Sequence, residues 1–202
     1  MKFCHYVFIV ILFCSNLVTK TVSADSLDAQ SNFIPLIKVG DWIFRKGVQI
    51  DSLVINQLGG GDFSHIGFII ATEPEVRVIH ATTGDNENLP NQVIISTIDE
   101  FTTPSLAQKY AIARPHFLSD QQQQLIVAEL LTKQGAPFVL ASRDEDHLYC
   151  TTLLYDAIVK IYPEFNLEWK YANFPLFNGI YLFPSAFADY EGITWIYHYS
   201  EN

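Results

Sequence analysis

The sequence predicts an α+β fold in which an antiparallel sheet, or a partial barrel, packs against helices. Segments rich in β-branched and aromatic residues come first, between residues 41 and 114. Two segments with apolar residues at helical spacing follow, from about residue 119 and from about residue 150. A chain in which the strands precede the helices favours an antiparallel sheet. A parallel sheet would be favoured if strands and helices alternated along the chain.

Five segments carry the strand signal, and turn residues separate them. Gly59-Gly60-Gly61 marks a loop before the second strand, and a tight turn around Thr72-Glu73-Pro74-Glu75 would join the second and third strands as a hairpin. The predicted strands, in order, are Asp41–Arg45, Phe63–Ala71, Val76–Thr82, Val93–Ile95 and Tyr110–Ala113.

Two helices are predicted after these strands. The first begins at Ser119, which can form a capping box with Gln122 three residues later. The second runs from about Cys150 to Tyr162. Cys150 lies on its apolar stripe, about one turn before Leu153, so we expect the cysteine at the helix start and facing the body of the protein.

The N-terminal segment has the three parts of a signal peptide. Lys2 supplies a positive start, residues 6–13 form an apolar run, and Val22-Ser23-Ala24 provides a cleavage site. The apolar run is well short of the ~20 residues that a membrane-spanning helix needs, which disfavours an anchor. We therefore expect a signal peptide at 1–24, a single domain at 25–202, a secreted or periplasmic location, and no stable membrane span after cleavage.

Charge and cysteine content narrow the possible functions. Removal of residues 1–24 takes away Lys2 and Lys20 and no acidic residue, so the formal charge changes from −10 to −12. Such a surface repels nucleic acid and anionic lipid headgroups. Cys4 and Cys14 also leave, and Cys150 remains as a lone thiol. In an oxidising compartment a leftover cysteine indicates a reactive thiol or an intermolecular bond.

The position of Cys150 suits a nucleophile. The thiolate is the reactive form, and a helix N-terminus stabilises negative charge. Together with a nearby imidazolium, it can lower the pKa of a thiol to roughly 3.5–7.5. The alternative is that Cys150 is a small buried hydrophobic residue, as free cysteines often are.

Two histidines stand out because both lie inside predicted strands. With a two-residue hairpin loop, His65 and His80 share one face of the strand pair, whereas a one-residue change of register would separate them. One imidazole would then take the thiol proton and the other would orient the first. Backbone N–H groups at the helix start could stabilise the oxyanion, and the Tyr149 hydroxyl is a second candidate donor unless it simply packs beside Cys150.

The same residue types also suit a zinc site. His65, His80 and Cys150 could bind the metal, with water in the fourth position. Metal-binding spacings such as Cys-x-x-Cys or His-Glu-x-x-His are absent from the sequence, which makes zinc the weaker alternative.

Several short motifs occur in an order that resembles a known family. The chain is similar to the circularly permuted papain-like amidases of the YiiX/YaeF type, within the NlpC superfamily, and to the related lecithin:retinol acyltransferases. The resemblance spans roughly residues 40 to 188. It rests on Gly40-Asp41-Trp42-Ile43, Phe63-Ser64-His65-Ile66-Gly67, Val78-Ile79-His80-Ala81, Tyr149-Cys150-Thr151-Thr152-Leu153 and Tyr181-Leu182-Phe183-Pro184-Ser185.

The resemblance implies a permuted papain-like fold and assigns roles to three residues. Cys150 would be the nucleophile, His65 its base and His80 the third polar residue. Two positions depart from the family pattern. Thr151-Thr152 stands where Ser-Glu often follows the cysteine, and His80 stands where glutamate is common. The histidine brings this chain nearer to the acyltransferases.

The combined hypothesis is a secreted thiol hydrolase, either a thiol protease or amidase, or an acyltransferase that works through an acyl-thioester. The substrate would be a peptide, another amide or an acyl lipid, and no cofactor is implied. The alternatives are a non-catalytic envelope binding module of the same fold and the zinc hydrolase. Residues 164–202 hold 12 of the 28 aromatic residues. They form either a core layer or an apolar acyl groove that includes Trp169 and Phe177.

Overall fold

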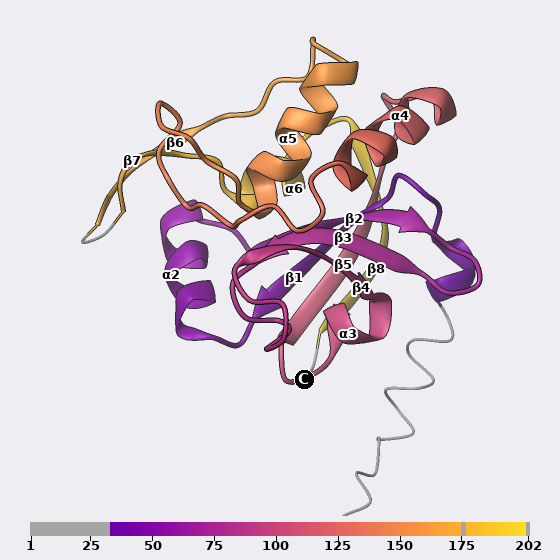
Figure 1. Cartoon of the computed structure of the whole chain (residues 1–202), viewed down its shortest axis with the longest axis horizontal. Helices are drawn as coiled ribbons and strands as arrows, with labels where there is room; N and C mark the ends of the chain where they lie inside the picture. Colours follow the sequence, from indigo (N-terminus) through magenta and orange to yellow (C-terminus); the bar gives the residue numbers. More distant parts are fainter. Residues whose placement is uncertain (1–32, 175–176, 201–202) are drawn as a thin grey trace, which may run out of the picture.

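The computed structural model describes residues 33–174 and 177–200 of the 202-residue chain. Within these ranges, six antiparallel strands form one open sheet in the order β4-β3-β2-β1-β5-β8, and helices cover its faces (Figure 1). The described residues form no closed barrel, and the predicted α+β class with an antiparallel sheet is confirmed. The predicted signal peptide lies outside the described residues.

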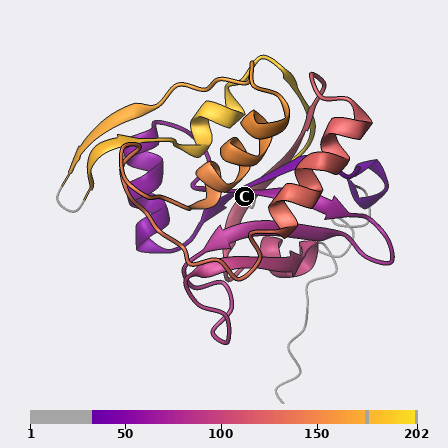
Figure 2. The same cartoon turned by 45° about the horizontal axis from the view of Figure 1, so that its top comes forward.

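The sheet contains all five predicted strands and a sixth at its edge. The strands are β1 (Trp42–Gly47), β2 (His65–Ala71), β3 (Arg77–Thr82), β4 (Gln92–Thr97), β5 (Ala107–Pro115) and β8 (Ile193–Ser200). A separate hairpin consists of β6 (Lys170–Phe174) and β7 (Phe177–Tyr181), and it extends to the same side of the molecule as α2 (Figure 2).

The two predicted helices are present, and the structure adds shorter ones. Ser119 accepts a hydrogen bond from the backbone N–H of Gln122, so the predicted capping box is confirmed. The helical segments are the 3₁₀ turn η1 (Ile34–Leu36), α2 (Ile50–Gly59), α3 (Ile98–Thr102), α4 (Asp120–Leu131), α5 (Cys150–Ile161) and α6 (Pro184–Ala188). Among the described residues, no helix combines the length and apolar character needed to cross a membrane.

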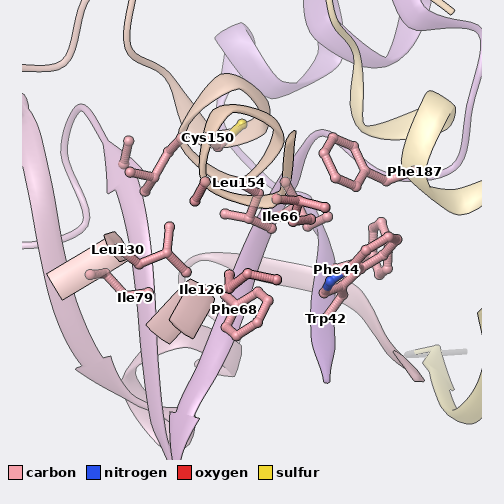
Figure 3. Close-up of a cluster of buried hydrophobic side chains, with 14 of the residues drawn as sticks. Trp42, Phe44, Ile66, Phe68, Ile79, Ile126, Leu130, Cys150, Leu154 and Phe187 are labelled. Carbon is pink, nitrogen blue, oxygen red and sulfur yellow. The ribbon is translucent and has the colours of Figure 1, made fainter. Parts of the chain in front are cut away.

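Strand alternation places two of the core clusters on opposite faces of the sheet. Trp42 and Phe44 of β1 join the larger cluster, which includes side chains of α4 and α5 (Figure 3). Ile43 lies between them in the chain and joins the smaller cluster with Phe101 of α3. Successive strand residues point to opposite faces, so the face of every β1, β2 and β3 side chain follows from this pattern.

The β2–β3 hairpin differs from the predicted tight turn. Its loop spans residues 72–76, and the ladder begins with Ala71 opposite Arg77. The register then shifts, and Ile69 pairs with Val78. This irregularity, a β-bulge, places one extra residue on β2 and restores the odd sum of paired positions that the two-residue loop would have produced. The prediction that the two histidines share a face is therefore confirmed, although the predicted loop length is wrong.

Candidate active site

The buried cysteine lies at the first turn of α5. The helix starts there because Tyr149 is extended and its backbone N–H donates to the Thr152 hydroxyl at 2.9 Å. Cys150 is 7% exposed and belongs to the larger core cluster, together with Ile66 of β2 and Leu154 of α5 (Figure 3). The predicted position at the helix start, facing the protein body, is confirmed.

Burial, rather than the helix start, controls the acidity of the thiol. It raises the pKa of Cys150 to about 11, although hydrogen bonds from the backbone N–H groups of Ile66 and Thr151 favour the thiolate. The expected lowering of the thiol pKa is therefore wrong for this structure. The reason is that desolvation penalises the thiolate more than the helix N-terminus stabilises it.

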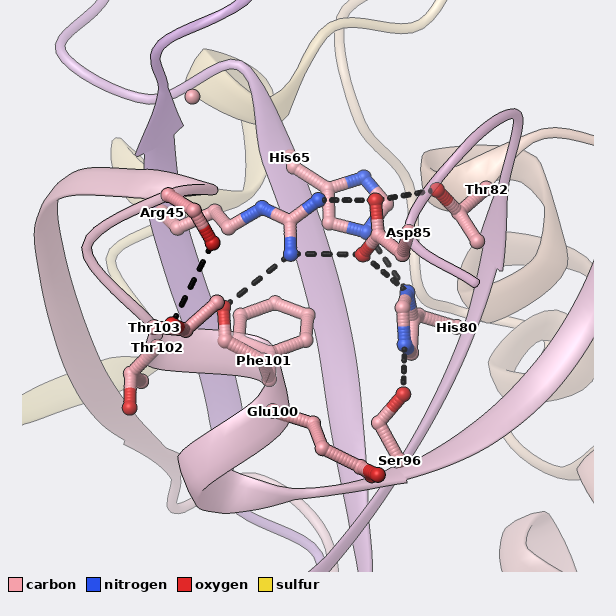
Figure 4. A network of polar contacts seen from close by, with 12 residues as sticks. Arg45, His65, His80, Thr82, Asp85, Ser96, Glu100, Phe101, Thr102 and Thr103 are labelled. Atoms are coloured by element: carbon pink, nitrogen blue, oxygen red, sulfur yellow. Dashed lines mark hydrogen bonds and ion pairs between the residues drawn. The ribbon is translucent and has the colours of Figure 1, made fainter. Parts of the chain in front are cut away.

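The two histidines form a buried hydrogen-bonded chain. His65 Nε2 and His80 Nδ1 are 2.9 Å apart, and His80 Nε2 lies 3.0 Å from the hydroxyl oxygen of Ser96 on β4 (Figure 4). Because β2 pairs with β3 at Phe68–Ile79, the histidines are diagonal neighbours on one face. The predicted shared face is confirmed by this direct contact.

An aromatic side chain from α3 covers both imidazoles. The ring of Phe101 stacks on His65 with 5.4 Å between centroids and meets His80 edge-on at 5.0 Å. Burial is the main reason that the pKa of His65 falls well below its usual value and that of His80 falls to about 3. Both imidazoles are therefore neutral at physiological pH.

A buried ion pair that the sequence analysis did not identify lies beside the histidines. Arg45 Nη2 donates to Asp85 Oδ1 at 2.7 Å, and Arg45 Nη1 lies 2.7 Å from Asp85 Oδ2. The second carboxylate oxygen is 3.8 Å from His80 Nδ1 (Figure 4). Burial opposes ionisation of Asp85, but hydrogen bonding and charge from Arg45 outweigh it and hold the pKa of this carboxyl below its ordinary value.

Only one residue of this ion pair could be identified from the sequence pattern. Arg45 follows Trp42-Ile43-Phe44, so it is a charged residue on the same face of its strand as the apolar Ile43. A charge at such a position requires a buried partner. Asp85 lies in the loop after β3, where periodicity carries no information.

The cysteine and the histidines approach one another at the start of β2. The β2–β3 ladder runs from Phe68–Ile79 to Ala71–Arg77, so it stops before Ile66. The backbone N–H of Ile66 is instead close enough to the Cys150 sulfur to favour its thiolate. The Cys150 sulfur therefore lies beside the peptide group that joins His65 to Ile66. The side chains of Ile66 and His65 point to opposite faces, so Cys150 comes from the α5 face and the imidazoles from the α3 face.

An apolar pocket opens beside Cys150. Residues of α2, the start of α5 and the segment before α6 line most of it. The lining residues are Ile55, Leu58, Leu140, Tyr149, Cys150, Thr151, Tyr181, Leu182, Phe183 and Pro184.

The residues expected to line an acyl groove do not line this pocket. Trp169 is not among the lining residues and instead packs edge-on against Tyr155. For Phe177, only the backbone is described.

The hydroxyl of Tyr149 is already hydrogen-bonded. It accepts from the backbone N–H of Leu182 at 2.9 Å, and the Thr151 hydroxyl donates to the Leu182 carbonyl at 2.7 Å. These two bonds hold the backbone of Leu182 against the two residues that flank Cys150 at the start of α5. Tyr149 therefore holds Leu182, which lines the pocket. This contact differs from the predicted hydrogen bond from Tyr149 to an oxyanion.

The expected zinc ligands are not the residues that come together. In the part of the chain that the structure describes, the only candidate metal group is His65, His80 and Asp85, whose ligand atoms lie within 4.8 Å of one another; Cys150 does not belong to it. Arg45 already neutralises Asp85. The two imidazole nitrogens are 2.9 Å apart, whereas about 3.3 Å is needed around a tetrahedral zinc with its usual bond lengths. This arrangement fits a metal poorly.

Comparison with known proteins identifies the fold. No family model and no curated protein sequence matches the chain. The crystal structure of the metalloprotein YiiX from Escherichia coli O157:H7 is similar, with a TM-score of 0.67 and 19% sequence identity. The match covers 81% of this chain and 98% of that chain. This chain therefore has a YiiX-like fold, in agreement with the resemblance of its motifs.

Proposed function

We propose that this protein is a thiol-dependent hydrolase or acyltransferase that cleaves an amide or ester bond. One observation carries the proposal. The backbone N–H of Ile66, the residue next to His65, favours the thiolate of Cys150, and His65 begins the buried chain through His80 to Ser96. A nucleophile and a base that is itself oriented by a third group are the parts that acyl transfer requires.

Acid–base catalysis by His65 requires one pattern of donors and acceptors along the hydrogen-bonded chain. In the productive arrangement, His80 Nε2–H donates to Ser96 Oγ, and His65 Nε2–H donates to His80 Nδ1. The lone pair on His65 Nδ1 is then free to accept the thiol proton. Ser96 is compatible with this arrangement, because its hydroxyl oxygen can accept a hydrogen bond from His80 Nε2.

The first half-reaction forms a thioester. The proton of Cys150 moves to His65 Nδ1 as the sulfur bonds to the carbonyl carbon, and the carbonyl electrons move to oxygen. The tetrahedral intermediate collapses, the bond to the amine or alcohol breaks, and His65 returns the proton to that leaving group. Backbone N–H groups at the start of α5 are the proposed oxyanion donors, and Tyr149 supports them by holding Leu182.

The second half-reaction restores the thiol. Water, or another nucleophile in an acyl transfer, gives its proton to His65 as its oxygen bonds to the thioester carbon. The carbon–sulfur bond then breaks, and the sulfur recovers the proton. Both groups start neutral, because burial raises the thiol pKa and lowers the imidazole pKa values. The proton therefore moves only when substrate is present.

An acyl-activity probe followed by mass spectrometry tests the nucleophile. We expect a mass increase of one probe group on the peptide that contains Cys150, and no increase in Cys150→Ser. His65→Gln should reduce the labelling rate while leaving the fold intact. Labelling that persists in Cys150→Ser, or that is insensitive to His65→Gln, would contradict the proposed pair.

The similar structure is that of a metalloprotein, which raises a second candidate function that depends on a metal. His65, His80 and Asp85 are the group that would serve it. Metal analysis of the purified protein separates the two. Stoichiometric metal that is lost in His80→Gln and retained in Cys150→Ala favours the metal site. A metal-free protein that still turns over substrate favours the thiol.

We also propose that the protein is exported after removal of residues 1–24. The intact mass of the protein recovered from the periplasm or medium should correspond to a chain that begins at Asp25. A recovered mass that retains residues 1–24 would exclude this cleavage.

The non-catalytic binding module remains the alternative to an enzyme. A wild-type protein that binds ligand without turnover would support it.

A further inference from the structure

Opposite charges lie beside the two histidines. Arg45 of β1 stands directly across from His65 of β2 in the strand ladder, so the two side chains share the α3 face of the sheet. Asp85 lies next to the second histidine, with its Oδ2 3.8 Å from His80 Nδ1 (Figure 4). A cation therefore neighbours the first imidazole of the hydrogen-bonded chain, and an anion neighbours the second.

Several contacts hold Asp85 in this position. Its Oδ1 accepts hydrogen bonds from Arg45 Nη2 and from the Thr82 hydroxyl, each at 2.7 Å. Its Oδ2 contacts Arg45 Nη1 in the ion pair but accepts no well-aligned hydrogen bond from the described residues. The side chain is 10% exposed, so solvent screens its charge only weakly. The oxygen nearest to His80 is therefore a fixed negative charge with room to interact with a cation.

Two imidazoles in one chain compete for a proton on nearly equal terms. In a triad whose third member is an aspartate, the proton stays on the histidine, because an imidazole binds a proton more tightly than a carboxylate does. In this chain the second and third members, His65 and His80, are both imidazoles. Their surroundings therefore decide which ring carries the positive charge.

The neighbouring charges act differently on the two rings. Burial is the largest influence and lowers the pKa of both histidines. The next-largest influence on His65 is the charge of Arg45, which lowers its pKa further. The next-largest influence on His80 is the charge of Asp85, which raises its pKa. His80 is thus the ring whose surroundings better accommodate a positive charge.

We propose that the two histidines form a proton relay, in which the positive charge that develops during the reaction rests on His80 beside Asp85 rather than on His65. The inference rests on the proposed thiol reaction. As the Cys150 sulfur bonds to the carbonyl carbon, its proton moves to His65 Nδ1, and the proton on His65 Nε2 moves to His80 Nδ1, 2.9 Å away. His65 is then neutral, and His80 is an imidazolium. When the leaving group departs, it takes the proton from His65 Nδ1, and His80 returns its proton to His65 Nε2. Asp85 acts through His80 and is a positioning residue.

A proton inventory tests the relay in the unaltered protein. We would measure kcat/KM, which reports the formation of the thioester, for p-nitrophenyl acetate in mixtures of H2O and D2O. Each moving proton contributes its own isotope factor to the rate. A relay that moves two protons in one step therefore gives a curved plot against the deuterium fraction, whereas a single moving proton gives a straight line. We expect the curve, and a straight line would overturn the relay.

His80→Gln separates a relay from simple orientation of the base. The amide oxygen of glutamine can still accept the hydrogen bond from His65 Nε2, but it cannot take up the proton. We expect kcat/KM to fall on the order of 100-fold and the proton inventory to become linear. A plot that stays curved, or a rate within about threefold of the wild type, would show that His80 only orients His65 and would overturn the relay.

Asp85→Asn removes the counter-charge and keeps the size of the side chain. It should lower kcat at least about tenfold with little change in KM, because the charge that Asp85 stabilises exists only during the reaction. Glu75→Gln is the matched control, since Glu75 also pairs with an arginine but is 48% exposed, in the loop of the same hairpin. Equal kcat values in the two variants would overturn the role of Asp85. If Asp85→Asn does not fold, the wild-type inventory and His80→Gln decide.

Cys150→Ser separates failure of the relay from failure of the proposed function. Hydrolysis of p-nitrophenyl acetate that persists in this variant would overturn the thiol mechanism and the relay with it. Hydrolysis that requires Cys150 but gives a straight proton inventory in the wild type would overturn the relay alone. Stoichiometric metal that is lost in His80→Gln would also overturn the relay, because the metal would occupy the nitrogen that receives the proton.

Discussion

Replacement of Arg45 by Met should destabilise the protein strongly, because it leaves a buried carboxylate without its cation. The side chains of Arg45 and Asp85 are only 7% and 10% exposed. The guanidinium also donates to the Phe101 carbonyl at 3.1 Å. Removal of one partner from a buried ion pair costs about 3–5 kcal/mol, mainly through desolvation of the charge that remains. We expect Arg45→Met to fall in this range.

The double variant separates the loss of the pair from the loss of packing. Arg45→Met with Asp85→Asn removes both charges, so the free energy of unfolding should recover by at least about 1 kcal/mol relative to Arg45→Met alone. Lys160→Met is the control, since Lys160 is 60% exposed and pairs with Glu129 at the surface. Solvent screening limits that pair to about 0–1 kcal/mol.

Urea unfolding measures all four proteins, with midpoints compared at a common m-value. If Arg45→Met costs no more than Lys160→Met, the pair does not stabilise the fold as argued. A double variant that is as unstable as Arg45→Met would show instead that the lost contacts with Phe101, rather than the unpaired buried charge of Asp85, cause the effect.

Three further predictions concern the thiol and the histidines. Alkylation of Cys150 by iodoacetamide should be slow at neutral pH, and its rate should rise about tenfold per pH unit up to the thiol pKa of about 11. A rate that levels off near pH 9 would refute the raised pKa. The free energy of unfolding should fall as pH decreases from about 6.5 to about 5, because the unfolded histidines take up protons and the buried ones, with lowered pKa values, do not. The free energy of unfolding should change by up to about 1.4 kcal/mol per pH unit for each histidine, and the change should be smaller in His80→Gln. Equal pH dependence of the two proteins in urea unfolding would contradict this. Ser96→Ala should lower kcat about tenfold with little change in KM in steady-state assays, whereas Ser96→Thr should keep most of the rate; equal losses would indicate a packing effect only.

Local signals in the sequence were sufficient for the elements that carry the site. Ser119 and Gln122 determined the start of α4 because a capping box involves only neighbouring residues. The apolar stripe of α5 determined that Cys150 faces inward, since helical periodicity alone sets the face. The composition of β2 and β3 likewise predicted two strands that each carry a histidine.

The tertiary structure decided how these elements combine. The bulge near Ile70, rather than the length of the turn, puts His65 and His80 on one face, because a single extra residue inverts every side chain before it. The partner of Arg45 comes from a loop 40 residues away in the chain. The pKa of Cys150 rises because distant segments cover the helix start. Sequence patterns determine which face a side chain takes within its own element, whereas burial and long-range pairing exist only after the elements have packed.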